Sequence, residues 1–233
     1  MKLQRFFIEN ELEVENEVKI TDVEFVHQVF HVFRKRVGDE IVLLDNTGYE
    51  FLSEIMVLNK KEVDLKILNK TQVSNVLKNE VVLFASLIKK DKFEWVLEKC
   101  TELGVSKFMP VISERSEKKG LNLERAKKII KEASEQSERG FVPEICEPVL
   151  LEDALESLGY EAIVLNLTGQ KYNGEQLKSI TKLGLFVGPE GGWGEKDLEI
   201  FEKNNISLVT LGSQVLRAET ASVAVCAEVL LYF

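Results

Sequence analysis

From residue 80 onwards the sequence alternates short, continuously apolar segments with longer amphipathic ones, and this alternation limits the possible folds more than any other feature. Five segments have the length and the Val, Ile, Leu and Phe content of buried strands: EVVLFASLI, SKFMPVI, EAIVLNL, LGLFVG and ISLVTLG. Strands of a parallel sheet are covered on both faces and therefore carry few polar residues. The alternation predicts an α/β domain with a parallel sheet between layers of helices.

Amphipathic helices are predicted between these strands. The first ends at Gly104 and places five apolar side chains on one face, at Phe93, Val96, Leu97, Cys100 and Leu103. The second follows Asn122, which can cap it, and its apolar side consists of Leu123, Ala126, Ile129, Ile130 and Ala133. A helix after Gly194 and a buried helix over residues 218–233 complete the pattern.

Residues 1–70 have a different pattern, in which turns separate short segments rich in Val, Ile, Leu and Phe. RFFIE, VKI, EIVLLDN, YEFLSEIMVLN and VDLKIL are predicted strands. Gly38-Asp39 forms one turn, and Asn46-Thr47-Gly48 joins two strands as a hairpin. The result is a small barrel or an open sheet. Since the polar stretch 69–78 lacks periodicity, we predict one domain over residues 1–70 and a second over residues 71–233.

Cysteine usage and hydropathy indicate the compartment. Cys100, Cys146 and Cys226 are odd in number and form no CxxC pair, which excludes a disulfide framework and a zinc ribbon and indicates a reducing environment. No segment approaches the ~20 apolar residues of a membrane span. The first residues become acidic where a secretory signal would stay apolar. We therefore expect a soluble, cytoplasmic protein with no membrane partner.

The charge distribution is uneven along the chain. The formal net charge of −9 argues against a nucleic-acid partner. Residues 86–140, however, carry 13 Lys and Arg against 10 Asp and Glu, whereas residues 141–233 carry 6 against 14. A local basic patch, and not the total charge, is what contacts phosphate. The middle of the chain is thus a candidate nucleic-acid surface, although a solvated helix face of mixed charge would give the same pattern.

Three segments at the carboxyl ends of the predicted strands are candidate ligand loops: residues 166–169, 188–194 and 212–220. The second has the sequence GPEGGWG, with four glycines in seven residues directly after a strand. There the backbone either turns sharply or lets a ligand approach closely. The loop is neither a P-loop nor a GxGxxG dinucleotide motif. A purely structural turn remains the alternative.

Charged residues in the third loop and the two histidines are further candidate site residues. Arg217 and Glu219 stand at the start of an Ala-rich buried helix, where an unpaired charge is costly. They either face a ligand or form an ion pair, Arg217–Glu219 or Arg217–Glu190. His27 and His31 are four residues apart, but no third ligand lies nearby in the sequence, so no metal site is predicted. The chain has no GxSxG motif, and a serine hydrolase would lack an obvious base.

Several of these segments together resemble one family. LFVGPEGGWGEKDLE and VTLGSQVLRAETASVAV resemble the signature of the RsmE-type 16S ribosomal RNA uridine-N3 methyltransferases, which belong to the SPOUT superfamily. KKDKFEWVLEKCTELGVSKFMPVISERSEKK and EASEQSERGFVPEI resemble the central segments of that family, and RFFIE and HVFRKRVGDEIVLLDNTGYEF resemble its N-terminal barrel. The chain departs from the family pattern at Gln214, where arginine is usual, and at Ala218, where threonine is usual.

The resemblance implies a PUA-like, RNA-binding β-barrel at the N-terminus and a SPOUT α/β domain with a deep trefoil knot at the C-terminus. It also implies a homodimer, S-adenosylmethionine as methyl donor and no metal. The three loops would then form the cofactor pocket. The cofactor-binding residues carried over from the family are Leu165, Asn166, Gly188, Glu190, Gly191, Gly192, Leu211, Gly212, Leu216, Arg217 and Thr220.

The implied reaction is methylation of N3 of a uridine in 16S ribosomal RNA of the small ribosomal subunit. Neutral uracil N3 carries a proton and is a poor nucleophile, so the reaction needs a base or a cation that stabilises the anion. Arg217 could hold the anion, and Glu190 or Glu219 could take the proton. Two alternatives are methylation of another RNA position and a non-catalytic RNA-binding or ribosome assembly role. The expected RNA contacts are Arg5, Arg34, Lys35, Arg36, Lys89, Lys90, Arg115, Lys118 and Lys119.

Overall fold

The computed structural model describes residues 3–9, 12–73, 79–117, 120–174 and 180–230. The chain divides into two compact units. The first consists of Met1–Val76 together with Ser134–Val142, and the second of Leu77–Ala133 together with Pro143–Phe233. Each unit has its own apolar core.

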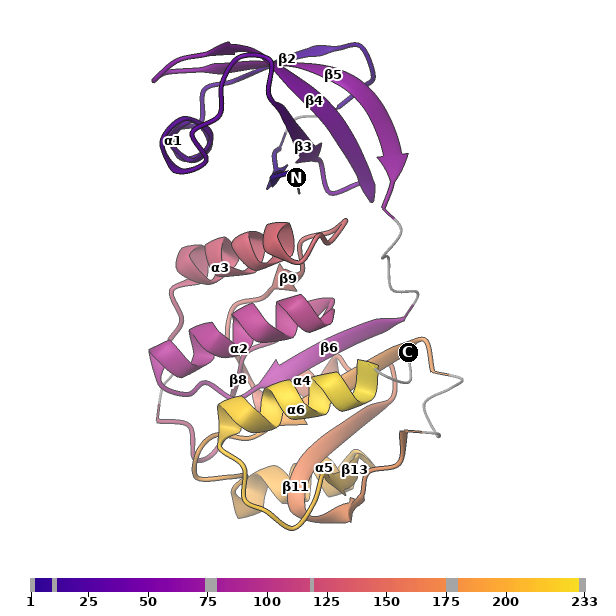
Figure 1. Cartoon of the computed structure of the whole chain (residues 1–233). Helices are drawn as coiled ribbons and strands as arrows, with labels where there is room; N and C mark the ends of the chain where they lie inside the picture. The colour runs from indigo at the N-terminus through magenta and orange to yellow at the C-terminus, as the bar shows by residue number, and fades with distance from the viewer. Residues whose placement is uncertain (1–2, 10–11, 74–78, 118–119, 175–179, 231–233) are drawn as a thin grey trace. The chain divides into compact units, whose positions relative to one another are not determined.

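The first unit is built on a five-stranded sheet with the strand order β1-β3-β4-β5-β2 (Figure 1). The strands are β1 (Arg5–Phe7), β2 (Glu17–Ile20), β3 (Glu40–Leu44), β4 (Tyr49–Leu58) and β5 (Val63–Gln72). β1 and β3 are parallel, and the other pairs are antiparallel. All five predicted strands are confirmed. So is the β3–β4 hairpin, where Asn46 and Gly48 take φ angles of +64° and +83°.

A short helical segment between β2 and β3 was not predicted from the sequence. It consists of α1 (Val23–His27) and the π-helix η1 (Gln28–Val32). The side chain of Asp22 caps it by accepting a hydrogen bond from the Phe25 amide at 2.8 Å. The side chains of Phe25, Val26 and Val29 are buried in the apolar core of the first unit. The segment is too short for a helical period to stand out among the β-rich sequence around it.

The segment Ser134–Val142 belongs to the first unit although it lies far along the chain. The Phe7 amide donates to the Glu135 carboxylate at 2.8 Å, and the Val142 amide donates to the Asn46 side chain at 2.7 Å. These long-range contacts place the segment beside the N-terminal sheet, whereas the sequence pattern predicted that all of residues 71–233 form the second domain.

The second unit contains a six-stranded sheet in which every neighbouring pair is parallel, as predicted. Its strand order is β13-β11-β12-β6-β7-β9. The longer strands run through the middle of the sheet because they carry the continuous apolar runs of the sequence. The strands are β6 (Glu80–Ala85), β7 (Lys107–Phe108), β9 (Glu144–Ile145), β11 (Ala162–Lys171), β12 (Lys182–Val187) and β13 (Ser207–Thr210).

The predicted strand SKFMPVI is split by Pro110. Its first part is β7, and its second part is β8 (Val111–Ile112), which pairs with β10 (Val149–Leu150) in a separate two-stranded sheet. A proline has no amide proton to donate to a ladder, so the pairing with β6 stops at Phe108 and only a single bridge, between Ser86 and Val111, follows Pro110. The prediction of one continuous strand was therefore wrong in this detail.

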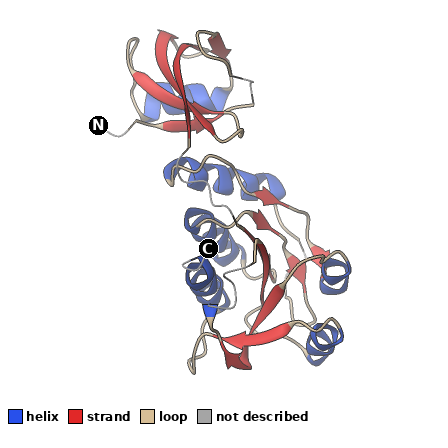
Figure 2. Cartoon of the chain, turned by 90° about the vertical axis from the view of Figure 1, so that its right-hand side faces the viewer, coloured by secondary structure: helices blue, strands red, loops and turns tan. Residues whose placement is uncertain are grey.

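Helices cover both faces of the six-stranded sheet (Figure 2). α4 (Leu151–Glu156) and α5 (Glu195–Lys203) pack on one face, where Phe84 stacks on Phe186 at 4.2 Å between ring centroids. α2 (Lys90–Leu103) and α6 (Ala218–Leu230) pack against each other, and α6 contacts β12. α3 (Leu123–Gln136) begins after Asn122, whose side chain accepts from the Arg125 amide at 3.0 Å, so the predicted cap is confirmed.

Candidate functional site

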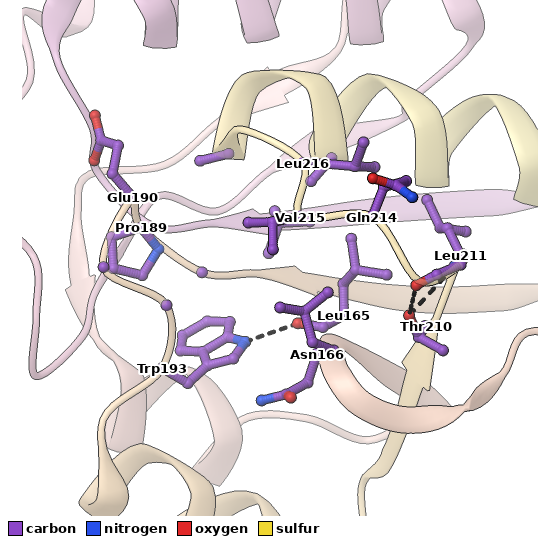
Figure 3. A pocket seen from close by; sticks show the side chains of 18 residues that line it. Leu165, Asn166, Pro189, Glu190, Trp193, Thr210, Leu211, Gln214, Val215 and Leu216 are labelled. Carbon is purple, nitrogen blue, oxygen red and sulfur yellow. Dashed lines mark hydrogen bonds between the residues drawn. The ribbon is translucent and has the colours of Figure 1, made fainter.

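A pocket of about 310 Å³ lies at the carboxyl ends of β12 and β13 and beside the middle of β11, which lies between these two strands (Figure 3). Its walls come from all three segments predicted from the sequence, whose first residues stand at positions 166, 188 and 212 of the chain. One side is formed by Leu165, Asn166 and Leu167 in the middle of β11, one by the loop after β12, and one by the connection between β13 and α6. This is the edge at which open parallel sheets bind their ligands.

The first wall lies within β11 itself and is not a loop, contrary to the prediction for residues 166–169. The strand is irregular between Leu165 and Gln170, where its register against β13 shifts. The Asn166 side chain accepts hydrogen bonds from the amide and the hydroxyl of Thr168, both at 2.9 Å. A Cβ atom on Gly169 would lie 2.5 Å from the Val209 amide nitrogen. Only glycine lets the two backbones approach this closely.

The second wall is the loop 188–194, which is held by hydrogen bonds within the loop and by hydrogen bonds to neighbouring segments. The Gly192 amide donates to the Pro189 carbonyl at 2.9 Å, and Gly192 has a φ of +69°, a conformation that favours glycine. Trp193, which is 5% exposed, donates from Nε1 to the Leu165 carbonyl at 3.1 Å (Figure 3). The indole thus ties this loop to the backbone of β11 at Leu165.

A buried carboxylate anchors the far end of the same loop. Asp197 in the first turn of α5 is 3% exposed and accepts hydrogen bonds from the Gly194 amide at 2.9 Å and the Glu114 amide at 3.1 Å. The Arg115 guanidinium donates to the Gly191 carbonyl at 3.0 Å. The segment after β8 therefore supports the glycine loop from outside the pocket.

The third wall is the connection between β13 and α6. The Thr210 hydroxyl donates to the Gly212 carbonyl at 2.8 Å and shapes the start of this connection (Figure 3). Val215 is 80% exposed, and Leu216 and Leu167 are exposed beside it at the mouth of the pocket. The pocket therefore has an apolar rim that solvent reaches.

Most of the residues expected to bind a cofactor are brought together here. Nine of them line the pocket: Leu165, Asn166, Gly188, Glu190, Gly191, Gly192, Leu211, Gly212 and Leu216. Arg217 and Thr220 are exposed and lie outside the lining. Further lining residues were not among the named cofactor residues. Pro189, Trp193 and Val215 lie within the predicted loops, whereas Val187, Thr210 and Ala221 lie within two residues of them, so slightly wider boundaries would have found these three.

The three candidate catalytic residues have different surroundings. Glu190 is exposed on the pocket rim, and its Oε1 lies 3.5 Å from the Lys89 amide nitrogen. Glu219 is 8% exposed and forms an ion pair with Lys92 of α2, in place of the Arg217 partner that the sequence suggested. Burial raises the pKa of Glu219, but the hydrogen bond from Lys92, the helix amide and the charge of Arg217 outweigh it and lower the pKa overall.

The expected RNA contacts also differ in how accessible they are. The Arg5 side chain is 15% exposed and pairs with Glu50 at 3.1 Å and Glu138 at 3.4 Å, so its charge is already compensated. Lys35 donates to a backbone carbonyl at 3.1 Å. Arg34, Arg36, Lys89, Lys90 and Arg115 are exposed, whereas Lys118 and Lys119 lie outside the described residues.

Two further expectations concern metal and membrane. Within the described ranges, no group of three or more His, Cys, Asp or Glu side chains could hold a metal ion. His27 and His31 lie with their ring centroids 5.2 Å apart. Among the helices of those same ranges, none is long and apolar enough to cross a bilayer.

A parallel α/β unit with a ligand pocket at its carboxyl edge, joined to a β-rich unit, matches the two parts of one class of protein. Residues 75–230 match the family described as RNA methyltransferase domain, and residues 26–68 match the RNA methyltransferase PUA domain. The class defined by fold and site is therefore that of the RNA methyltransferases.

Individual relatives give the particular branch of this class. The chain is 31% identical to ribosomal RNA small subunit methyltransferase E of Bacillus subtilis, over 94% of this chain and 93% of the relative. It is 30% identical to the protein of the same name from Rickettsia conorii, over 98% and 96%. A crystal structure of the Neisseria gonorrhoeae protein of that name, bound to S-adenosyl methionine, matches with a TM-score of 0.93 and 29% identity, over 100% of this chain and 98% of that one. The chain belongs to the family of ribosomal RNA small subunit methyltransferases E.

The pocket fits the cofactor of this family by the chemistry of its walls. Leu165, Val187 and Leu211 offer apolar surface for a nucleoside base, and the glycines at 188, 191, 192 and 212 leave backbone groups accessible. The Glu190 carboxylate on the rim can attract a sulfonium or an ammonium group. A volume of about 310 Å³ lies within the usual range for small-molecule sites.

Proposed function

We propose that this protein transfers a methyl group from S-adenosylmethionine to N3 of a uridine in 16S ribosomal RNA of the small ribosomal subunit, in the cytoplasm. The observation that carries the proposal is the pocket itself. Three segments distant in sequence form one glycine-rich, apolar-walled cavity at the carboxyl edge of the parallel sheet. The names of the relatives at 30–31% identity and their coverage of nearly the whole chain support the substrate.

The topology supports the further proposal of a trefoil knot. β13 lies at the edge of the sheet beside β11, whereas the helix that follows it, α6, packs on β12 and α2. The connection over residues 211–217 must therefore return past β11 to reach α6. Such a return is one part of a knotted crossing, which also requires the chain to pass through a loop formed by an earlier segment.

We also propose a homodimer. Val215, Leu216 and Leu167 expose apolar surface at the pocket mouth, and Trp95 on α2 is 40% exposed. Apolar surface of this kind beside a site is typical of an interface. A second copy packed there would shield the pocket from water.

The chain's own residues meet the chemical needs of this reaction as follows. When bound, S-adenosylmethionine would supply a methyl group on a sulfonium sulfur, and the sulfur would leave as a nucleophile bonds to that methyl group. The N3 proton of uracil must leave, and we propose that Glu190, which is exposed and lines the pocket, accepts it. Arg217 is exposed next to the pocket and stays a candidate for an anion or phosphate contact.

Exposed basic side chains would hold the RNA by its phosphates. Arg34 and Arg36 of the first unit and Lys89, Lys90 and Arg115 of the second are the described candidates. Substitution of any one side chain that binds a phosphate should reduce the steepness of the salt dependence of RNA binding by roughly one unit. Arg5 is the weakest candidate because two carboxylates already pair with it.

Mass spectrometry of small-subunit RNA tests the proposal. Small subunits from a strain that lacks the gene, incubated with purified protein and labelled S-adenosylmethionine, should gain one N3-methyluridine. Label on another position would assign a different RNA methyltransferase activity. If no label is transferred and calorimetry detects no cofactor binding, the chain is a non-catalytic RNA-binding factor.

A further inference from the structure

A second cavity, of about 240 Å³, lies in the second unit at the first turns of α2 and α3, where the two helices lie side by side (Figure 1). Its walls come from the loop after β6, from the first two turns of α2 and from residues 120–126. Its described lining shares no residue with the lining of the cofactor pocket. The cavity is therefore separate from the site of the cofactor.

The interior of this cavity is apolar. It is lined by four side chains that are each at most 5% exposed, those of Leu87, Ile88, Phe93 and Ala126. The volume of about 240 Å³ lies below the range that is usual for drug-sized ligands. The cavity therefore suits a smaller group with apolar faces.

Polar groups at the mouth of the cavity offer both donors and acceptors. The Arg125 guanidinium donates to the Glu94 carboxylate from Nη2 at 3.1 Å and from Nε at 3.3 Å. Because a guanidinium carries five N–H groups, Arg125 keeps donors for a ligand. The Asn122 side chain accepts a hydrogen bond from the Arg125 amide at 3.0 Å and fixes the first turn of α3. The Lys90 ammonium lies 3.8 Å from Glu94, and its side chain is 76% exposed.

The charge at the mouth does not select an anion. Lys90 and Arg125 both face Glu94, and the carboxylate of Asp91 is exposed next to Lys90 in the sequence. A phosphate group alone would also leave the apolar interior unused. A neutral, planar group with donors and acceptors along its edge fits both parts of the cavity. A nucleobase has this chemistry.

The cavity lies next to the cofactor pocket along the sheet. β6 and β12 are neighbouring strands, and the loop after β6 bounds the cavity as the loop after β12 bounds the cofactor pocket. The two loops are in contact. The Ser86 amide donates to the Val187 carbonyl at 2.9 Å, and the Lys89 amide nitrogen lies 3.5 Å from a Glu190 carboxylate oxygen. A polynucleotide that brings one base to the cofactor pocket can therefore place a nearby base in the cavity.

We propose that this cavity binds an unstacked base of the RNA substrate, a few nucleotides from the target uridine, and so helps to select the site of methylation. The inference rests on the proposed function, because it takes RNA as the substrate. Proteins that read RNA sequence do so mostly at unpaired bases, whose faces pack on side chains and whose edges form hydrogen bonds. Arg125 and Glu94 would bind the edge of the base, and the apolar interior would contact its faces.

Co-sedimentation with small subunits from a strain that lacks the gene, over a range of salt concentrations, tests the proposal. Ala126→Leu fills the cavity and should weaken binding by roughly tenfold, the effect of one lost base contact. Arg125→Gln should weaken binding by a similar factor without changing the slope of log affinity against log salt, because it removes a base contact and no phosphate contact. Calorimetry should show the affinity of both variants for S-adenosylmethionine within about twofold of wild type. Unchanged binding of small subunits by both variants overturns the proposal.

Lys127→Gln is the matched control. Lys127 is exposed on the same helix and pairs with the Glu124 carboxylate at 3.2 Å, but it lies outside the cavity lining. An equal loss of binding in Lys127→Gln, or a fall of about one unit of salt slope in Arg125→Gln, would assign the effect to charge and contradict the inference.

Folding and assembly are checked separately. If Ala126→Leu does not fold, the exposed substitution Arg125→Gln decides the matter. A change in the mass of Ala126→Leu by light scattering would assign the cavity to a contact between copies and refute the base-binding role. Because the assay measures binding alone, a wild-type protein that transfers no methyl group refutes the proposed function, whereas unchanged binding by the variants refutes this inference.

Discussion

Asp197 offers the sharpest test of how the glycine loop is held. Its carboxylate is 3% exposed and accepts hydrogen bonds from two backbone amides, those of Gly194 and Glu114. Asp197→Ala removes the carboxylate, so both amides lose their hydrogen-bond acceptor. The Gly194 amide is buried, whereas the Glu114 amide is partly buried and can recruit water.

The expected cost follows from these two donors. An unsatisfied buried donor costs roughly 1–3 kcal/mol, so we assign about 2 kcal/mol to Gly194 and about 1 kcal/mol to Glu114. The total of about 3 kcal/mol corresponds to a fall in Tm of roughly 6–12 °C for a chain of this size. Because the loop carries Gly191 and Gly192 of the pocket, the affinity for S-adenosylmethionine should fall by about tenfold.

Urea denaturation and calorimetry measure both effects, and Asp153→Ala is the matched control. Asp153 also lies in the first turn of a helix, α4, but it is exposed. Its loss should cost at most about 1 kcal/mol through the helix dipole. If Asp197→Ala destabilises the protein no more than Asp153→Ala does, the anchoring role of the buried carboxylate is refuted.

Three further predictions use other parts of the second unit. Gly169→Ala should destabilise the protein by about 3 kcal/mol in urea denaturation, because its Cβ would overlap the Val209 backbone; a change under about 0.5 kcal/mol contradicts this. A hydrogen bond with Cys226 and burial hold the pKa of the Cys100 thiol well above its usual value. Ellman's reagent at pH 8 should therefore modify Cys146 first and Cys100 only after unfolding. Trp193→Phe removes the hydrogen bond to the β11 carbonyl and should cost about 1 kcal/mol, with weaker cofactor binding by calorimetry.

The sequence by itself determined the local elements and the chemistry of the loops. Continuous apolar runs specified β6, β12 and β13, and Gly104 and Asn122 marked a helix end and a helix start as found. Four glycines after β12 marked one wall of the pocket. Such features depend on neighbours within a few residues, so they can be predicted from the local sequence pattern. The resemblance to one family added the cofactor and the substrate.

Only the tertiary structure decided which distant groups meet. Lys92 and Glu219 are 127 residues apart, and nothing in either local pattern pairs them. The same holds for Trp193 with the Leu165 carbonyl and for the segment Ser134–Val142 with the N-terminal sheet. These contacts depend on strand order and on how the helices pack, which arise from burial summed over the whole chain and not from any one segment.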